Sequence, residues 1–319
     1  MRWWRSAPAL GAARQAFAVF ALRGRTLAAF ELKPSPLLFP VSRVPEQPVA
    51  PAVRETLLTV ANAMPPSPGI LAQLGQVLLD PEADLLGIST MLKRDAALTA
   101  RIIRISNSAV YNTGEPYASL EAALARVGMK EVYRMAGFAA VTQMSDQRLT
   151  RYGISGVQLR ENALLGALVM EQLAERVGQD SRLAYTAGLL RSTGKIAVDR
   201  MARTTWDQQG DLTEWETSAA GISGCRAAAM VLGEWRFSGV MVRAILDHYL
   251  IDGSGDPLAY LLNLAAGAAS RGGHGLPGEA AFWALTPEKL SAARLDEGDV
   301  DDALLQALAT FAEIRTALD

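Results

Sequence analysis

The stretch from Lys93 to Ala109, KRDAALTARIIRISNSA, decides the fold of this chain. Asp95 stands directly before the helical pattern, and its carboxylate can accept hydrogen bonds from the unpaired amides of a first helical turn. Apolar side chains then recur at intervals of four, three and four residues, which places them on one face of an α-helix. The stretch therefore predicts a helix that follows Asp95 and buries one face, made by Leu98, Ile102, Ile105 and Ala109.

Helical spacing continues along most of the chain after Ala52. Ser119 is a second predicted N-cap, and Glu121 in the next turn suits the positive end of a helix dipole. No segment of this region alternates apolar and polar residues with period two, as a half-buried strand would. We therefore expect an all-α protein, a multi-helix bundle without a sheet. Longer helices are predicted over about 128–147, 157–177, 180–199, 213–234, 237–250, 256–271 and 299–318.

The first 51 residues differ from the rest. Residues 9–22 could form a helix and residues 26–32 could pair as a strand, so both alternatives stay open. Proline fixes φ and lacks an amide donor, so the later part of this segment should be extended and irregular. We therefore divide the chain into an N-terminal extension with a proline-rich linker, residues 1–51, and a helical domain, residues 52–319. The prolines are Pro34, Pro36, Pro40, Pro45, Pro48 and Pro51.

Composition limits the class of protein. The chain has 319 residues and a formal net charge of −2, so its overall charge gives no reason to expect a nucleic-acid partner. The single cysteine, Cys225, excludes an internal disulfide and fits a reducing compartment, and its apolar context predicts a buried thiol. No run of about 18 uncharged apolar residues exists, and Arg14 and Gln15 interrupt the stretch that imitates a signal peptide. We expect a cytoplasmic protein without a membrane partner.

Several landmarks of the chain, taken in order, resemble the HDOD family, the HD-related output domain of bacterial signalling proteins. The resemblance covers about residues 53–255 and leaves the helices of 256–319 outside it. It implies a helical bundle of the HD phosphohydrolase type, generally without the metal centre of those enzymes, that serves as a regulatory output. The landmarks are Pro65-Pro66-Ser67-Pro68, Asp80-Pro81, the stretch 93–109, SLEAALARVG at 119–128, Gly188-Leu189-Leu190 with Gly194-Lys195, Trp235 and His248.

This chain carries other residues at the positions where HD phosphohydrolases and their relatives keep metal ligands. A hydrolytic metal site needs three or more nitrogen or oxygen ligands, and the chain has only two histidines, His248 and His274. We therefore expect no catalytic residue, no metal ligand and no cofactor. The departures are Arg191-Ser192 in place of a His-Asp-like pair, Arg160 and Asn162 in place of an aromatic and a His or Ser, Gly224 in place of a His, and Tyr249 after His248 in place of a second His.

Four of the remaining polar residues are candidates for a ligand site. Arg191 and Lys195 are four apart on the predicted helix 180–199, near the position of the lost metal, and could hold an anion such as a phosphate. Asn162 and His248 would lie beside them. The alternatives are that Arg191 pairs with a carboxylate or extends to solvent, and that His248 is a packed or hydrogen-bonded histidine. His274, within Gly-Gly-His-Gly, is predicted as a loop residue.

Four other residues are candidates for a partner surface. Arg101 and Arg104, with Ser108 on the same predicted helix, form a basic face opposite the apolar stripe. This face is either solvated or meets an acidic partner or a phosphate. Asn107 and Ser108 are short polar residues at a helix end, so we expect them first to fix the turn between helices and second to contribute to recognition.

These observations predict a non-enzymatic bacterial signal-transduction module that acts by protein–protein interaction, in a pathway linked to cyclic dinucleotides. Two alternatives remain: a sensor that binds a nucleotide or another anion in the degenerate HD pocket, and a residual metal-dependent phosphohydrolase. The sequence predicts neither the partner's identity nor the oligomeric state.

Overall fold

The computed structural model describes residues 48–64, 67–77, 85–108, 111–112, 114–144, 148–249 and 256–316. All of them belong to one compact unit, Val41–Asp319. Residues 1–47 lie outside the described residues, so the extension predicted there, with its alternative helix and strand, stays a prediction.

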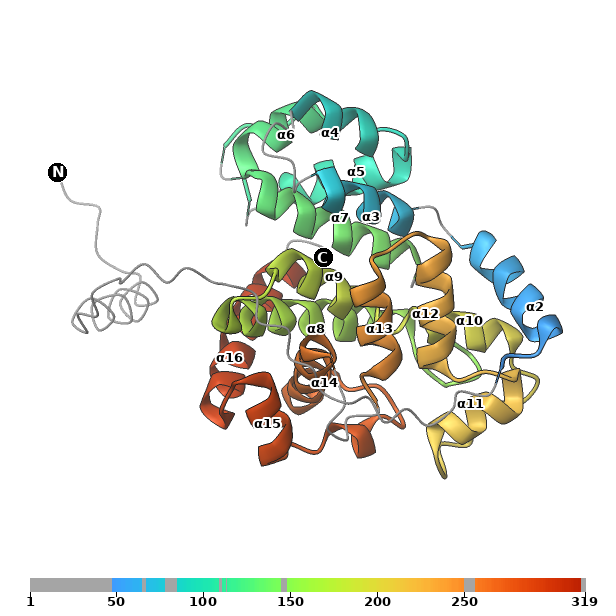
Figure 1. Ribbon diagram of the computed structural model, residues 1–319. Helices are drawn as coiled ribbons and strands as arrows, with labels where there is room; N and C mark the ends of the chain where they lie inside the picture. The colour runs from blue at the N-terminus through green and yellow to red at the C-terminus, as the bar shows by residue number, and fades with distance from the viewer. Residues whose placement is uncertain are drawn as a thin grey trace. The chain divides into compact units, whose positions relative to one another are not determined.

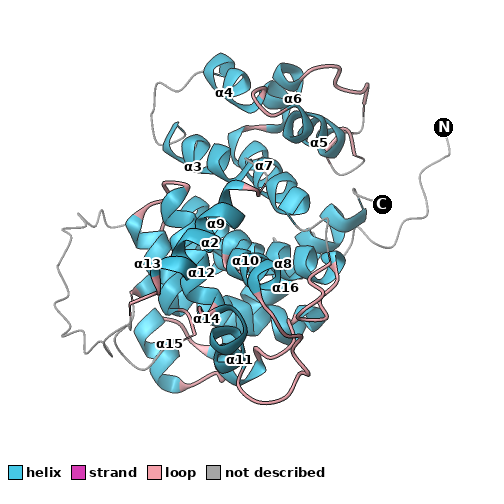
Figure 2. Cartoon of the chain, turned by 90° about the vertical axis from the view of Figure 1, so that its right-hand side faces the viewer, coloured by secondary structure: helices cyan, strands magenta, loops and turns pink. Residues whose placement is uncertain are grey.

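Helices make up nearly all of this unit, and the prediction of an all-α protein is confirmed (Figures 1 and 2). Within the described ranges there is no strand, only an isolated antiparallel bridge between Leu149 and Ile154. No described helix is both long enough and apolar enough to cross a bilayer. The helices of the N-terminal half are α2 (Pro51–Asn62), α3 (Ser67–Val77), α4 (Leu85–Leu92), α5 (Ala96–Ser106), α6 (Leu120–Val127) and α7 (Met129–Met144).

The remaining elements follow a short connection that contains the bridge. They are α8 (Gly156–Val177), α9 (Ser181–Leu190), α10 (Thr193–Met201), α11 (Leu212–Ala220), α12 (Gly224–Glu234), α13 (Gly239–Asp247), α14 (Pro257–Ala269), a π-helical turn (Ser270–His274), a 3₁₀ turn (Ala280–Trp283), α15 (Pro287–Ala293) and α16 (Glu297–Thr316).

Helix α7 organises the first group, α3–α7. It packs against α3 and α5, while α6 joins α4 and α5. The stretch 93–109 behaves as predicted where it is described: the Asp95 carboxylate accepts from the Leu98 amide at 2.9 Å, and Leu98, Ile102 and Ile105 are buried. The Ser119 hydroxyl likewise caps α6 by accepting from the Ala122 amide. Ala109 lies outside the described residues.

Helix α8 organises the second group, and α9, α14 and α16 all pack against it. Close approach of helices depends on glycine at two points. A Cβ on Gly188 of α9 would stand 2.6 Å from the Cα of Ala167 in α8, and a Cβ on Gly194 of α10 would stand 1.8 Å from the carbonyl oxygen of Gly224 in α12. Because these two glycines have no Cβ, the helices can pack closely at both points, and the first residues of α10 are buried in the bundle.

Two predicted helices are each divided in the structure. The prediction of one helix over 180–199 is wrong, because α9 ends at Leu190 and α10 begins at Thr193. The prediction over 213–234 is wrong in the same way, because Gly221 adopts φ 77° and ends α11 before α12 begins. Helical periodicity persists across both breaks because the helices on either side bury their apolar faces in one core. Helix α15 and the two short turns were not predicted.

Candidate functional site: a buried charge cluster and an open arginine cleft

The break between α9 and α10 falls at Arg191-Ser192, the pair that the family resemblance aligns with a His-Asp-like pair. Arg191 is therefore the C-terminal cap of α9, and Lys195 lies in the first turns of α10, so the two are not on one helix as predicted. Both side chains point into the bundle, and each residue is only 3% exposed. Desolvation of a cation is costly unless an anion accompanies it, so these positions require buried partners.

Glu279 is the partner of Arg191. The guanidinium donates through Nη1 to Oε1 at 3.1 Å and through Nη2 to Oε2 at 2.9 Å, a bidentate ion pair. Nη2 also donates to Oδ1 of Asn162 at 2.7 Å, and the Asn162 amide donates to the backbone oxygen of His274 at 2.6 Å. The guanidinium stands 5.4 Å from the ring centroid of Trp283. Arg191 therefore pairs with a carboxylate, one of the alternatives left open by the sequence.

Lys195 lies between two carboxylates and two aromatic rings. Its Nζ is 3.3 Å from Oε1 of Glu279 and 3.6 Å from Oε1 of Glu216. It also stands 5.0 Å from the ring centroid of Tyr152 and 5.9 Å from that of Tyr249. Within the described residues Nζ has no partner in hydrogen-bond geometry, so the ammonium is held by charge and by the ring faces.

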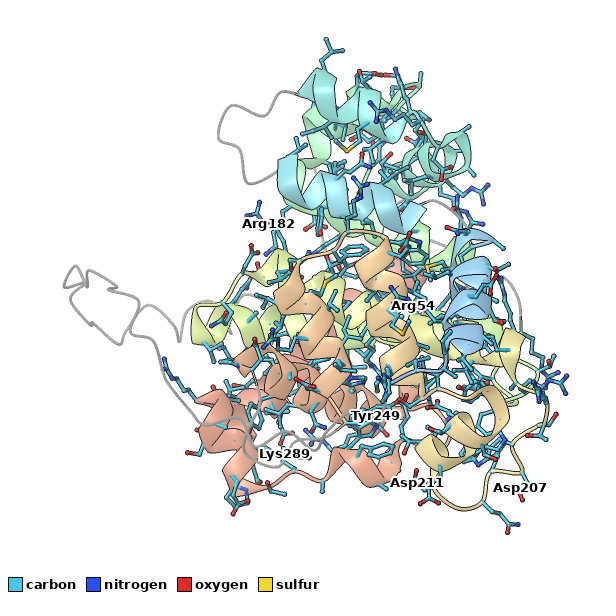
Figure 3. The ribbon with its side chains drawn as sticks, turned by 45° about the vertical axis from the view of Figure 1, so that its right-hand side comes forward. Arg54, Arg182, Asp207, Asp211, Tyr249 and Lys289 are labelled. Atoms are coloured by element: carbon cyan, nitrogen blue, oxygen red, sulfur yellow. The ribbon has the colours of Figure 1, made fainter. Side chains whose placement is uncertain are left out.

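Both carboxylates have further donors. The Tyr249 hydroxyl donates to Glu279 at 2.6 Å, and Figure 3 labels this tyrosine within the bundle. Glu216 accepts from the Tyr152 hydroxyl at 2.8 Å and from the Gly224 amide at 2.6 Å. Burial raises the pKa of the Glu279 carboxyl, but the opposing effect of Arg191 and Lys195 is greater and places that pKa at about 2. The formal charges of two cations and two carboxylates therefore cancel.

His248 borders the cluster without joining its charge network. It is buried, and its Nδ1 donates to the Ile245 carbonyl at 2.7 Å, with the Cys225 sulfur at 3.8 Å from the same nitrogen. Burial, and then the positive charge of Arg191, lower the pKa of this imidazole to about 3. His248 is therefore a neutral, hydrogen-bonded histidine of the core, and Cys225 is the buried thiol that the sequence predicted.

The donor atoms of this cluster do not fit a divalent metal ion. Within the described ranges no three His, Cys, Asp or Glu side chains are grouped so that they could hold one. The two carboxylates that could serve as ligands already face Arg191 and Lys195, whose charges would repel a dication.

The predicted ligand residues thus do come together, but with partners that the sequence did not reveal. Arg191, Lys195, Asn162 and His248 gather around the α9–α10 break. Glu279 is 88 positions from Arg191 along the chain. A buried cation signals that a carboxylate must be near, yet no sequence pattern tells which of the many acidic residues it is. Whether an anion binds here stays a prediction. His274 ends the π-helical turn, and its ring packs on Phe311.

The structure separates the four candidate partner residues into two pairs. The Asn107 side chain accepts from the Tyr117 amide at 2.6 Å and donates to the Tyr117 carbonyl at 3.0 Å, so it holds the loop before α6. The Ser108 hydroxyl donates to the Ile105 carbonyl at 2.7 Å. Ser108 lies beyond the end of α5, so its prediction as a helix residue is wrong.

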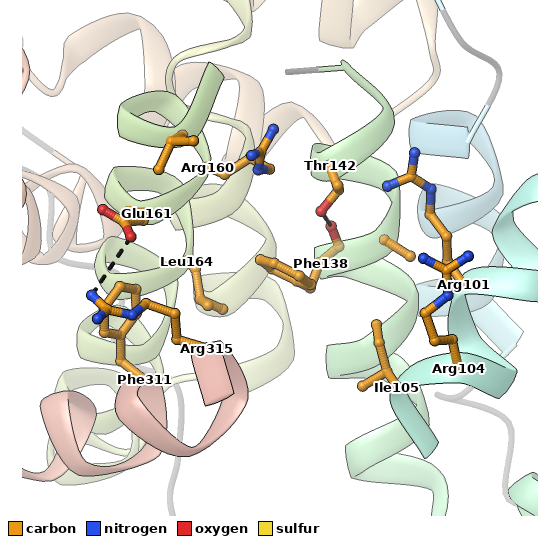
Figure 4. A pocket seen from close by; sticks show the side chains of 12 residues that line it. Arg101, Arg104, Ile105, Phe138, Thr142, Arg160, Glu161, Leu164, Phe311 and Arg315 are labelled. Atoms are coloured by element: carbon orange, nitrogen blue, oxygen red, sulfur yellow. Dashed lines mark hydrogen bonds and ion pairs between the residues drawn. The ribbon is translucent and has the colours of Figure 1, made fainter. Parts of the chain in front are cut away.

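Arg101 and Arg104, by contrast, line an open cleft between α5 and α7 on one side and α8 and α16 on the other (Figure 4). Arg160, whose position the sequence marked only as a departure from the family pattern, lines the same cleft.

Comparison with known proteins identifies the family. The chain matches the HDOD domain family over residues 64–251, more than half of its length. It therefore belongs to the HDOD family, as the resemblance predicted.

Solved structures of similar fold agree with this assignment. An HDOD domain protein of unknown function from Geobacter sulfurreducens matches with a TM-score of 0.61 and 20% identity, over 83% of this chain and 98% of that one. A protein from Shewanella amazonensis SB2B, provisionally described as a phosphohydrolase, matches with a TM-score of 0.57 and 21% identity over 83% and 98%. A protein from Marinobacter aquaeolei VT8, provisionally described as a signal transduction protein, matches with a TM-score of 0.59 and 20% identity over 83% and 64%. No curated protein matches this chain.

Proposed function

We propose that this chain is a non-enzymatic signal-transduction module that acts in the bacterial cytoplasm by binding another protein. Membership of the HDOD family supports a role in signalling, and so does the similarity in fold to the Marinobacter protein described in those terms. The observation that carries the non-enzymatic part is the buried cluster of Arg191, Lys195, Glu216 and Glu279, which lies around the Arg191-Ser192 pair that the family resemblance aligns with a His-Asp-like pair.

The cluster supports this proposal through its charge balance. A hydrolytic metal needs ligand lone pairs, and here the carboxylate lone pairs are committed to a guanidinium, an ammonium and two tyrosine hydroxyls. An anion at the same place would have to displace Glu279 from Arg191 while both remain buried. We therefore assign the cluster a structural role, which leaves the outer surface of the bundle for recognition.

The alternative of a phosphohydrolase has a direct test. Purified protein is loaded with Mn²⁺, Fe²⁺ or Zn²⁺, freed of unbound ions, and measured both for bound metal and for hydrolysis of a generic phosphodiester. We expect less than one metal ion per ten chains and no turnover above the buffer control. Stoichiometric metal together with turnover that Glu279→Gln abolishes would refute the non-enzymatic proposal.

The protein-binding part needs a test of its own. The full chain is expressed in its host with a photo-crosslinking amino acid placed at single exposed positions, and the crosslinked products are identified by mass spectrometry. We expect one protein to be recovered from a contiguous set of surface positions and to bind the purified chain directly. Recovery of only background proteins from every position would contradict a function by protein contact.

A further inference from the structure

The cleft between the two helix groups combines positive charge with an apolar wall. It encloses about 290 Å³. Arg101 and Arg104 come from α5, Arg160 from α8 and Arg315 from α16, so basic side chains reach it from both sides (Figure 4). The remaining lining residues are Ile105, Phe138, Ala139, Thr142, Val157, Glu161, Leu164 and Phe311.

Charge in this cleft is unbalanced among the residues that line it. Glu161 is the single carboxylate, and it already lies 3.3 Å from Nδ1 of His274 and 3.8 Å from Nη1 of Arg315. Arg101 and Arg160 take part in other interactions as well. Arg104 and Arg315 are solvent-exposed and approach the cleft from opposite sides, so their guanidinium groups can turn to a ligand at little cost.

The floor of the cleft is apolar. Phe138 of α7 and Phe311 of α16 line it but are nearly fully buried, whereas Val157 of α8 is 51% exposed, and Figure 4 shows the Phe138 ring directed across the cleft towards Leu164. A flat ring of a ligand can pack on such a wall, as in most small-molecule sites, where a few polar groups fix the orientation of a largely apolar contact.

We infer that this cleft binds a small phosphate ester that carries a planar ring, with the size of a mononucleotide. The planar fork of arginine fits phosphate oxygens through paired, charge-assisted hydrogen bonds, and more than one arginine is within reach here. A volume of about 290 Å³ is at the lower end of the range for small-molecule sites, which favours one ring with one phosphate over a dinucleotide.

This site is distinct from the buried cluster and does not depend on the function proposed above. Arg191 already has its carboxylate inside the core, whereas Arg315 of the cleft has only a loose contact of 3.8 Å with the partly exposed Glu161. A ligand here would contact α5, α7, α8 and α16 together, so it would link the two helix groups and raise the melting temperature of the chain.

The test measures binding of AMP, inorganic phosphate and adenosine to the full chain by isothermal titration calorimetry and by thermal shift. We expect AMP to bind more tightly than phosphate, because only AMP uses the apolar wall, and adenosine to bind weakly or not at all. Arg104→Glu and Arg315→Glu should each weaken AMP binding about tenfold or more. Arg126→Glu, an equal charge change on an exposed residue of α6 that does not line the cleft, should leave it unchanged.

Three outcomes would overturn the inference. One is the absence of AMP binding up to millimolar concentration in a folded protein. Another is equal affinity for AMP and inorganic phosphate, which would show charge attraction without a ring site. The third is an equal loss of affinity in Arg126→Glu and Arg104→Glu, which would show that binding follows net charge alone. Unchanged melting temperatures of the unliganded variants confirm that each comparison is made on folded protein.

Discussion

The buried cluster and the open cleft use the same kinds of side chain under opposite conditions. In the cluster, Arg191 and Lys195 are sealed from water, and Glu216 and Glu279 balance them. In the cleft, four arginines and one carboxylate, Glu161, are among the lining residues, and Arg315, which lies 3.8 Å from Glu161, is exposed to solvent, as is Arg104. The difference shows that burial forces a cation to have a fixed partner, whereas water allows an excess of charge that a ligand can use.

Removal of a carboxylate should lower the free energy of unfolding far more in the buried cluster than in the cleft, and this is the largest difference expected between the two regions. Glu279→Ala leaves Arg191 and Lys195 without their shared anion in the core, so we expect the free energy of unfolding to fall by about 3–5 kcal/mol. Glu161→Ala removes a partly exposed carboxylate whose contacts with His274 and Arg315 are screened by solvent, and should cost at most about 1 kcal/mol. Urea denaturation of both variants beside the unmodified chain measures the difference.

A paired substitution separates lost charge balance from lost packing. Arg191→Met combined with Glu279→Leu removes both charges, so it should recover part of the stability that Glu279→Ala loses. Equal stability of Glu279→Ala and Glu161→Ala would contradict the assignment of Glu279 as the anion of a sealed network.

The pH dependence of the free energy of unfolding should reflect two buried groups, His248 and Glu279. His248 has a pKa of about 3 in the folded protein, below its ordinary value of 6.5, so the unfolded chain binds the extra proton between these values. Stability is therefore lost as pH falls from about 6.5 towards 3, by up to about 1.4 kcal/mol per pH unit. The carboxyl of Glu279, lowered to about 2, adds a loss in the same direction below about pH 4.5.

Between pH 6.5 and 5 the effect of His248 can be seen without that of Glu279. In this window His248→Gln should show a shallower decline of the unfolding free energy than the unmodified chain, as measured by denaturation at each pH. An identical decline in both proteins would mean that His248 is not held neutral by burial.

Asn107 gives a smaller effect that distinguishes a loop residue from a recognition residue. Asn107→Ala removes the two hydrogen bonds to the Tyr117 backbone, so we expect a loss of about 1–2 kcal/mol in unfolding free energy. The crosslinking pattern of the partner should then stay the same in a variant that is still folded. Full stability with loss of the partner would reverse this assignment.

The smallest change is expected from the exposed arginines. Arg104→Glu should alter the unfolding free energy of the unliganded protein by no more than about 0.5 kcal/mol, because its charge is in solvent. A loss of several kcal/mol, measured by the same denaturation, would show that Arg104 is a structural member of the bundle and would remove the distinction between the two regions.

Local features of the structure could be predicted where the chemistry is local. Asp95 and Ser119 cap their helices as predicted, because a cap needs only the amides two or three residues ahead. The breaks after Leu190 and Ala220 were missed, since the apolar periodicity on which the prediction relied continues across them. Of the buried cluster, the sequence predicted the cations Arg191 and Lys195, from their place in the family pattern. It did not predict the carboxylates of Glu216 and Glu279.

The sequence by itself determined the helical class and the two caps, because these follow from residue type and spacing along the chain, and its motifs carried the resemblance through which the family was predicted. Tertiary structure alone decided that Glu279 meets Arg191, that Asn107 holds its own loop, and that Arg101, Arg104, Arg160 and Arg315 surround one cleft. The physical reason is distance along the chain: pairing between helices depends on how whole faces pack, and no local pattern records which distant residue a buried charge will meet.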